Sequence, residues 1–296
     1  MRTFGQHTDP IHTIVHLSDP HFLADAAALY GSVDTDRTLL AAVNRIAAEI
    51  ESADAIVVTG DLADRGESDA YDRVAATLEP LAKRLGAQLV WVMGNHDERL
   101  PFARRLYGED IDRPQDRVVD LDGLRLIALD STVPGYNHGV IDSDQLEWLK
   151  AELARPSRHG SILAMHHPPL ASPVRLMGLI ELRDLSSLRD VVAESDVRAI
   201  LAGHLHYPTF GTFAGIPVSV ASATCYTIDP LAGHREFIGT DSGHAFSLVQ
   251  VHEQSIVHSV VSPLAADPVT NYTADFIATL ERMTSDQRDE AFSRKR

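Results

Sequence analysis

The sequence is poor in cysteine, in basic residues and in long apolar runs. A single cysteine, Cys225, among 296 residues excludes an intramolecular disulfide framework and fits a reducing compartment. Lys and Arg number 26 against 42 Asp and Glu, so the net charge of -16 disfavours a protein that grips nucleic-acid phosphates. The N-terminus has no apolar signal core, and no stretch approaches about 18 uninterrupted apolar residues. We therefore expect a soluble, cytoplasmic protein that binds neither membranes nor nucleic acid.

Histidine is what the sequence has in unusual number, with 15 residues. Because histidine is the commonest side-chain ligand of metals, the positions of these residues matter. The rest of the composition is that of an ordinary globular protein, with 44% hydrophobic and 23% charged residues. The length favours one large domain with a well-buried core.

Short apolar runs alternate with amphipathic stretches, which predicts an α/β fold with strands joined by crossover helices. Buried strands are expected at residues 13–17, 55–59, 89–93, 124–129, 161–165 and 198–202. Helices are expected from Asp34 or Thr35, from about Ser68, from Ser143 and over residues 185–193. Pro80 should kink or split the second helix, and Gly86 should end it. From Ile216 to Val261 the pattern is that of alternating strands, and residues 273–296 are predicted to form a C-terminal helix.

Side chains that can bind metals follow five of the predicted strands. In chain order they are Asp19 and His21, then Asp61, then Asn95 and His96, then His166 and His167, then His204 and His206. Each group alone has a structural explanation, since Gly60-Asp61, for example, is a common turn. His204 and His206 are more specific, because two histidines at i and i+2 are expected to point the same way from an extended segment. Their joint occurrence at carboxyl ends of strands predicts one shared site.

These donors fit a pair of divalent ions about 3.5–4 Å apart that share one carboxylate. Asp61 is the natural bridge, because it is an anion on a tight turn between the other groups. Imidazole, carboxylate and amide donors without a thiolate suit manganese, iron, cobalt or zinc. Two such ions, two carboxylates and one bridging hydroxide leave a net charge of about +1, which matches a phosphodiester monoanion. The hydroxide is available at neutral pH because metals lower the pKa of bound water.

Taken together, the motifs resemble those of the calcineurin-like metallophosphoesterases. They span residues 19–206, about two-thirds of the chain, and stand as Asp19-Pro20-His21, Gly60-Asp61-Leu62-Ala63-Asp64-Arg65-Gly66, Gly94-Asn95-His96-Asp97, His166-His167-Pro168-Pro169 and Gly203-His204-Leu205-His206. The resemblance implies a four-layered αββα sandwich with a dinuclear centre at a sheet edge. We expect residues 1–262 to form the catalytic domain and residues 263–296 to form a helical C-terminal extension.

The resemblance also implies a role for each motif residue. One metal ion would be held by Asp19, His21, Asp61 and His206, and the second by Asp61, Asn95, His166 and His204. His96 would contact the phosphate and protonate the leaving alkoxide, while Asn95 and His21 would also face the substrate. Asp64 would orient His96, although it also fits the pattern of a helix-start acid beside Arg65. Purple acid phosphatases place a metal-bound tyrosine where this chain has Asp64, so no tyrosinate colour is expected.

Within the family, the likeness is strongest to the bacterial class III cyclic-nucleotide phosphodiesterases, through residues 163–169, 181–184, 197–206 and 216–226. It implies that a metal-bridging hydroxide hydrolyses 3′,5′-cyclic AMP or GMP to the 5′-monophosphate, with iron and manganese as the preferred metals and a homodimer as the assembly. A broad-specificity phosphodiesterase for 2′,3′-cyclic nucleotides or glycerophosphodiesters stays open. A non-catalytic scaffold is disfavoured because all the ligands are present. Candidates for recognition of the base are residues 136–138, residues 176–179 and Tyr226.

Overall fold

The computed structural model describes residues 4–232, 236–264 and 267–295. The chain divides into two compact units: Ile11–Leu264 form the larger, and Met1–Pro10 together with Ala265–Arg296 form the smaller. Among the described residues, no helix is long and apolar enough to cross a lipid bilayer.

The larger unit alternates strands and helices along most of its length. Its strands are β1 (His12–Leu17), β2 (Ala55–Thr59), β3 (Gln88–Val92), β4 (Arg117–Leu121), β5 (Leu124–Leu129), β6 (Ser161–Met165), β7 (Val197–Ala202), β8 (Thr209–Phe213), β9 (Ile216–Val220), β10 (Thr227–Ile228), β11 (Gly239–Thr240), β12 (Phe246–Val251) and β13 (Ile256–Val261). Its α-helices are α1 (Thr35–Glu49), α2 (Ser68–Leu85), α3 (Arg99–Phe102), α4 (Ser143–Leu153) and α5 (Leu185–Val192). Shorter helical turns cover Ala24–Ala26, Ala103–Tyr107 and Arg175–Leu179.

Two large sheets carry the fold. The first has the strand order β13-β12-β1-β2-β3 and the second has the order β4-β5-β6-β7-β9-β8. Strands β1, β2 and β3 are parallel to one another, with β3 at an edge of the first sheet, and β5, β6, β7 and β9 are parallel in the second. Antiparallel pairing joins β12 to β1 and to β13, β4 to β5, and β8 to β9. The polar, alternately exposed edge strands β4 and β8 carry too weak an apolar pattern to be predicted from the sequence.

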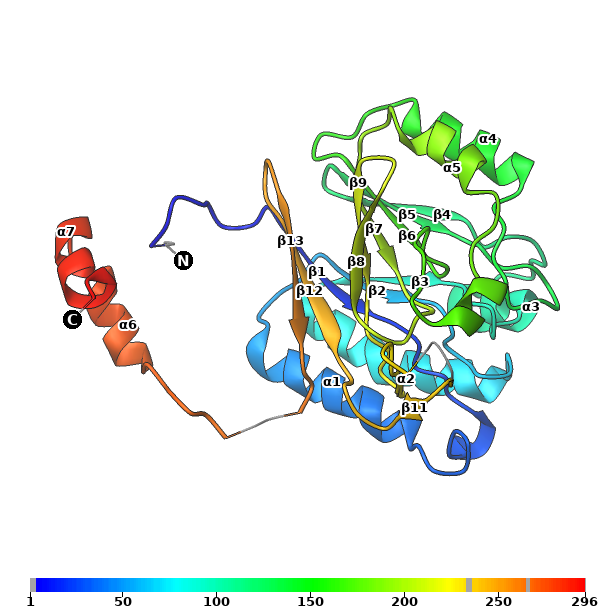
Figure 1. Ribbon diagram of the computed structural model, residues 1–296, viewed down its shortest axis with the longest axis horizontal. Helices are drawn as coiled ribbons and strands as arrows, with labels where there is room; N and C mark the ends of the chain where they lie inside the picture. Colours follow the sequence, from blue (N-terminus) through cyan, green and yellow to red (C-terminus); the bar gives the residue numbers. More distant parts are fainter. Residues whose placement is uncertain (1–3, 233–235, 265–266, 296) are drawn as a thin grey trace. The chain divides into compact units, whose positions relative to one another are not determined.

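Apolar side chains fill three layers between these elements. One cluster joins the first sheet to α1 and α2 through residues such as Ile56 and Leu78. A second lies between the two sheets and includes Val57 and Leu126, and a third joins the second sheet to α4 and α5. Figure 1 shows the two helix pairs on opposite sides with both sheets between them. The predicted four-layered αββα sandwich is therefore confirmed.

Local signals set most helix ends. Asp34 precedes α1 and its side chain accepts a hydrogen bond from the Arg37 amide, which is the capping interaction the sequence predicts. Gly86 ends α2 in the left-handed conformation, also as predicted. The expected split at Pro80 is wrong, because α2 continues through it. Pro80 and Ala76, one turn earlier, are both exposed, so water can solvate the freed carbonyl while the opposite face of the helix stays buried.

The smaller unit differs from the prediction of one C-terminal helix over residues 273–296. It contains α6 (Ala274–Glu281), α7 (Ser285–Arg288) and a last turn, Asp289–Ser293, and residue 296 lies outside the described residues. Thr284 separates α6 from α7, because its side chain accepts from the Gln287 amide and the Gln287 side chain accepts from the Thr284 amide. This reciprocal cap starts a new helix, so the expectation of a single continuous one is wrong.

Candidate metal centre

The predicted ligands come together where the loops after five strands meet. The loops follow β1, β2 and β3 of the first sheet and β6 and β7 of the second. Ligand atoms of Asp19, His21, Asp61 and His206 lie within 4.8 Å of one another. The sequence pattern described one sheet edge, whereas the structure builds the cluster from the same end of two facing sheets.

A first group of side chains surrounds His206. Its Nε2 lies 3.4 Å from Oδ1 of Asp19 and 3.2 Å from Nε2 of His21. The same nitrogen of His21 lies 3.3 Å from Oδ2 of Asp61. All four residues are almost fully buried, so the group is shielded from bulk water.

A second group surrounds His166. Its Nε2 lies 3.0 Å from Oδ1 of Asn95, 3.2 Å from Nδ1 of His204 and 3.3 Å from Oδ2 of Asp61. Asp61 thus presents one carboxylate oxygen to an imidazole of each group, at equal distances. This is the position that a carboxylate shared by two ions requires.

The imidazoles of the two groups are oriented as metal ligands are. In each ring the nitrogen that faces away from the group contacts an acceptor. These contacts join His21 Nδ1 to Asp64 Oδ1 (3.0 Å), His166 Nδ1 to the Thr59 carbonyl (2.7 Å), His204 Nε2 to the Ile180 carbonyl (2.9 Å) and His206 Nδ1 to the Tyr226 carbonyl (3.1 Å). A proton on each outer nitrogen leaves a lone pair on each inner one, and two facing lone pairs need a cation between them. The donor set therefore fits divalent ions.

Electrostatics within the cluster favour ionised carboxylates. Burial acts to raise the pKa of Asp61, but His166 and His96 hold it well below its ordinary value. Burial acts to lower the pKa of His166, but Asp61 and Asp19 raise it to about 9. Both directions show that the buried carboxylates favour positive charge at this position, which bound cations would supply.

The backbone is left-handed at five of the cluster residues. The φ angles are 51° at Asp19, 47° at His21, 51° at Asp61, 70° at His204 and 59° at His206. Such angles are uncommon for residues with side chains and cluster at functional sites. They also overturn the prediction that His204 and His206 lie on an extended segment and point the same way. Since β7 ends at Ala202 and the chain then bends, His204 joins His166 whereas His206 joins His21.

His96 and Asp64 are neighbours at the more open side of the cluster. Nδ1 of His96 contacts the backbone carbonyl of Asp64 at 2.9 Å and its carboxylate at 3.5 Å. The Asp64 carboxylate lies closer to His21, at 3.0 Å. The His96 side chain is 35% exposed, and its other ring nitrogen, Nε2, takes no part in these two contacts.

His167 packs beside the cluster, but neither of its ring nitrogens is hydrogen-bonded to a predicted ligand. Its Nδ1 contacts the Ser131 hydroxyl at 2.8 Å and its Nε2 contacts the Asn137 carbonyl at 3.0 Å. Both ring nitrogens thus have protein partners. Two of the candidate base-recognition loops lie near the cluster. The carbonyl of Asn137, in residues 136–138, contacts His167, and the carbonyl of Ile180, which follows residues 176–179, contacts His204.

Asp97 has a role that sequence reasoning missed, although it belongs to one of the motifs. Its carboxylate is buried and accepts hydrogen bonds from the backbone amides of Gly94 (2.9 Å), Leu62 (3.2 Å) and Ala63 (3.0 Å). It therefore ties the loop after β3 to the loop after β2. The motif contained the residue, but only the three-dimensional structure shows which amides it accepts from.

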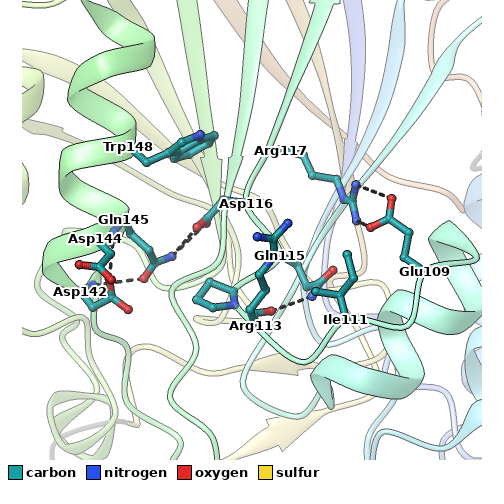
Figure 2. Close-up of a pocket in the computed structure, with 11 residues that line it drawn as sticks. Glu109, Ile111, Arg113, Gln115, Asp116, Arg117, Asp142, Asp144, Gln145 and Trp148 are labelled. Atoms are coloured by element: carbon teal, nitrogen blue, oxygen red, sulfur yellow. Dashed lines mark hydrogen bonds and ion pairs between the residues drawn. The ribbon is translucent and has the colours of Figure 1, made fainter.

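A separate hollow of about 410 Å³ lies between the loop before β4 and the start of α4 (Figure 2). Its lining includes none of the metal-centre residues. Several polar groups in it pair with each other: Arg117 contacts Glu109 at 3.1 and 2.6 Å, and the Gln145 amide donates to both oxygens of Asp116 at 2.9 and 3.0 Å (Figure 2). This hollow is thus distinct from the cluster that the motifs build.

Comparison of the sequence with known proteins agrees with this geometry. The family model described as calcineurin-like phosphoesterase matches residues 12–208. A probable cyclic nucleotide phosphodiesterase of Rhodococcus erythropolis is 51% identical over 266 residues, covering 88% of this chain and 87% of the relative. A cAMP/cGMP dual specificity phosphodiesterase of Mycobacterium tuberculosis is 48% identical over 258 residues, covering 87% and 81%.

Solved structures share the fold at low sequence identity. A purple acid phosphatase from yellow lupin seeds superposes with a TM-score of 0.60 at 15% identity, over 86% of this chain and 52% of that one. At this identity the likeness concerns the fold alone. The family match over most of the larger unit, the close relatives and the clustered ligands agree, and the chain belongs to the calcineurin-like phosphoesterase family.

Proposed function

We propose that this protein is a metal-dependent phosphodiesterase that hydrolyses 3′,5′-cyclic AMP and cyclic GMP to the 5′-monophosphates. The observation that carries the proposal is the carboxylate of Asp61, which lies 3.3 Å from an inward-facing imidazole of each group. Two close relatives named as cyclic nucleotide phosphodiesterases, each matched over more than four-fifths of its length, support the choice of substrate.

The seven predicted ligands divide naturally between two ions. We assign Asp19, His21, Asp61 and His206 to one ion and Asp61, Asn95, His166 and His204 to the other, in accord with the two groups of contacts. Divalent ions bound there supply Lewis acidity, which lowers the pKa of water toward about 7 and offsets charge on the phosphoryl oxygens. The O and N donors without a thiolate suit iron and manganese, which we propose as the native pair.

The other residues of the site bind the substrate and move a proton. His96 has its Nδ1 held by Asp64, so its Nε2 is the atom that contacts the phosphoryl group and gives a proton to the leaving 3′-oxygen. Asn95 and His21, beside it in the cluster, complete the contact surface for the phosphate. Asp64 keeps both His21 and His96 oriented, because its carboxylate faces Nδ1 of each ring.

The surroundings of the site complete the proposal. We place the catalytic domain within residues 1–262 and treat residues 263–296 as an extension that takes no part in the chemistry. The net charge of -16 favours a small phosphodiester over nucleic acid as the substrate. A homodimer is proposed from the likeness to class III enzymes, and a cytoplasmic location from the single, buried cysteine. Light scattering after gel filtration tests the assembly.

The test compares metal content and hydrolysis in the same preparations. Metal-free protein is reloaded with Mn²⁺ and offered 3′,5′-cyclic AMP, 2′,3′-cyclic AMP and bis(p-nitrophenyl) phosphate. Asp61→Asn replaces the shared carboxylate by a neutral amide, and Asn95→Ala removes one ligand. Both are expected to lower turnover by more than the roughly 10–100-fold typical of residues behind the ligands. The exposed residues Asp190 and Asn44 provide matched controls, Asp190→Asn and Asn44→Ala, which should behave as the wild type.

Each outcome separates the alternatives. Two ions per chain with metal-dependent turnover of 3′,5′-cyclic AMP is the expected result. Turnover of only the aryl or 2′,3′-cyclic substrates would support the metal-dependent mechanism but contradict the choice of substrate, and would indicate a broad-specificity phosphodiesterase. Absence of metal binding and of all turnover would contradict the enzyme and leave a scaffold of the same fold.

A further inference from the structure

We propose that Thr59 is a positioning residue that supports both halves of the metal centre. Its side-chain hydroxyl supports Asp19 through Ser18, and its backbone carbonyl supports His166. The inference rests on the proposed function only in taking Asp19 and His166 as metal ligands. Thr59 is the last residue of β2 and is fully buried, and no motif of the sequence includes it.

Four side chains form a continuous hydrogen-bond chain that ends on the Asp19 carboxylate. Nε2 of His16 lies 2.9 Å from Oγ1 of Thr59, and this oxygen lies 2.8 Å from Oγ of Ser18. The Ser18 hydroxyl then donates to Oδ2 of Asp19. All four residues are buried, and we call this series the His16–Asp19 chain.

The carboxylate sets the direction of every proton in this chain. An ionised carboxylate is only an acceptor, so Ser18 must donate to it and must accept from Thr59. Thr59 then uses its one hydroxyl proton on Ser18 and must accept from Nε2 of His16. Nδ1 of His16 has no hydrogen-bond partner among the described residues, which fits a neutral ring with its proton on Nε2.

His16 stays neutral over the working range of pH, so the direction of the chain persists. Its side chain is completely buried between the two sheets, on the face of β1 that also carries Ile14. Burial lowers the pKa of His16 to about 3, with His258 adding to the effect and Asp19 opposing it. A neutral donor at the inner end polarises the chain toward the carboxylate at the other end.

The chain determines which oxygen of Asp19 faces the metal position. Because Oδ2 is held by Ser18, Oδ1 is the oxygen that lies 3.4 Å from Nε2 of His206. The amide of His204 lies 3.2 Å from both oxygens and so does not by itself choose between them. The Ser18 hydroxyl therefore makes the choice. Thr59 keeps that hydroxyl in place, mainly through its own hydroxyl at 2.8 Å and also through its carbonyl, which lies 3.1 Å from Oγ of Ser18.

The carbonyl of the same residue acts on the other half of the centre. It lies 2.7 Å from Nδ1 of His166, which directs Nε2 of that ring toward Asp61 and Asn95. One residue thus holds a ligand of each ion, by its side chain on one side and by its main chain on the other. Substitutions at Thr59 change only the first of these contacts, which makes the two separable by experiment.

Gly203 encloses the chain from the second sheet. A Cβ at this position would lie 2.7 Å from Oδ2 of Asp19 and from the Thr59 carbonyl, and closer still to Oγ of Ser18. The main chain after β7 therefore packs directly on the hydroxyl of Ser18 and leaves no room for water beside it. Under these conditions a lost hydroxyl is not replaced by solvent.

The experiment measures Mn²⁺ binding to the metal-free full chain by calorimetry, with free Mn²⁺ counted by electron paramagnetic resonance. Thr59→Val removes the hydroxyl and keeps the carbonyl. We expect it to weaken the affinity for one of the two ions by about 10–100-fold and to leave the affinity for the other within about twofold of the wild type. Thr59→Ser restores the hydroxyl and should return both affinities to within about twofold of the wild type.

Further variants separate positioning from a general loss of packing. Ser18→Ala should weaken the affinity for the same ion. The double variant with Thr59→Val should bind that ion no more weakly than Ser18→Ala does, because both substitutions break the His16–Asp19 chain. Thr38→Val is the matched control: Thr38 is a buried threonine of α1 that bonds the Thr35 carbonyl, and its loss should leave both ions unchanged. Should Thr59→Val fail to fold, the comparison of Ser18→Ala with Thr38→Val decides the same question.

Three results would overturn the proposal. They are wild-type affinity for both ions in Thr59→Val or Ser18→Ala, equal weakening of both ions, and a Thr59→Ser variant as weak as Thr59→Val. Failure of the proposed function is a different result, since a wild type that binds two Mn²⁺ ions without hydrolysing cyclic nucleotides leaves these affinities to be compared. A wild type that binds no Mn²⁺ overturns both proposals.

Discussion

Gly94, between β3 and Asn95, packs so closely on Asp61 that a single methyl group there should damage the centre. A Cβ on Gly94 would lie 2.9 Å from Cγ of Asp61 and closer still to its amide nitrogen and Oδ1. Ordinary contact begins at 3.4 Å, so Gly94→Ala must move Asp61, its main chain as well as its carboxylate, at least 0.5 Å (3.4 minus 2.9) away from Gly94. The φ angle of Gly94 lies outside the left-handed region, so the expected damage comes from the contact with Asp61 and not from a φ angle that alanine avoids.

The magnitude follows from the tolerance of such sites. Functional groups must be held within about 0.5 Å of their productive positions, and a displacement of about 1 Å costs roughly 100-fold in rate. We therefore expect Gly94→Ala to lower turnover of 3′,5′-cyclic AMP by at least about tenfold. Overpacking also costs about 1–3 kcal/mol of unfolding free energy, which lowers the melting temperature by roughly 2–12 °C for a domain of this size.

Turnover of 3′,5′-cyclic AMP, calorimetric melting and Mn²⁺ titration of Gly94→Ala test this reasoning, with Gly5→Ala as the matched control. A Cβ on Gly5 meets no described atom within 4 Å, and the φ angle of Gly5 is also outside the left-handed region. The control should melt and bind Mn²⁺ as the wild type does. If Gly94→Ala does the same, the close packing of Gly94 on Asp61 is refuted.

Two further predictions concern stability rather than the centre. The pKa of His16 is lowered to about 3 by burial, so the metal-free protein should lose about 1.4 kcal/mol of unfolding free energy for each pH unit below about 6.5, where the unfolded ring takes up a proton and the folded one does not. Urea unfolding between about pH 5 and 7.5 should show that the unfolding free energy of His16→Gln falls less steeply with decreasing pH than that of the wild type. An equal pH dependence in both proteins would contradict the prediction. Arg125, 9% exposed, pairs with both oxygens of Asp196 at 2.8 and 3.0 Å, so Arg125→Met should cost about 3–5 kcal/mol while the variant still binds two Mn²⁺ ions. Denaturant titration measures the unfolding free energy of Arg125→Met, and calorimetry measures its Mn²⁺ binding. An unfolding midpoint equal to that of the wild type would show that the ion pair contributes little to stability.

The helices and buried strands could be predicted because their signals are local. Runs such as residues 55–59 and 161–165 are mostly apolar and rich in Ile, Val or Leu, and the structure has strands with those bounds. Asp34 and Gly86 act on helix ends within a few residues of themselves. Where a local rule competed with burial, as at Pro80, burial of the opposite helix face decided the outcome and the rule failed.

The candidate ligands could be named from the sequence because the motifs recur at strand ends in a fixed order. Their division into two contact groups and the place of Asp61 between them depend on two sheets meeting face to face. No local pattern encodes that meeting, since it arises from the apolar layer between the sheets. The same holds for the left-handed backbone at His204 and His206, which the extended interpretation missed.

The sequence by itself determined the family, the fold class and the chemical types at the centre, because these follow from residue identity and spacing. Tertiary structure alone decided which nitrogen of each imidazole faces inward and which oxygen of Asp19 faces His206. The reason is physical: these orientations depend on acceptors and donors contributed by distant segments, such as Thr59, which lies 41 residues from Ser18 and 107 from His166. The chemical type of a side chain determines what it can bind, and the neighbours packed around it determine its orientation.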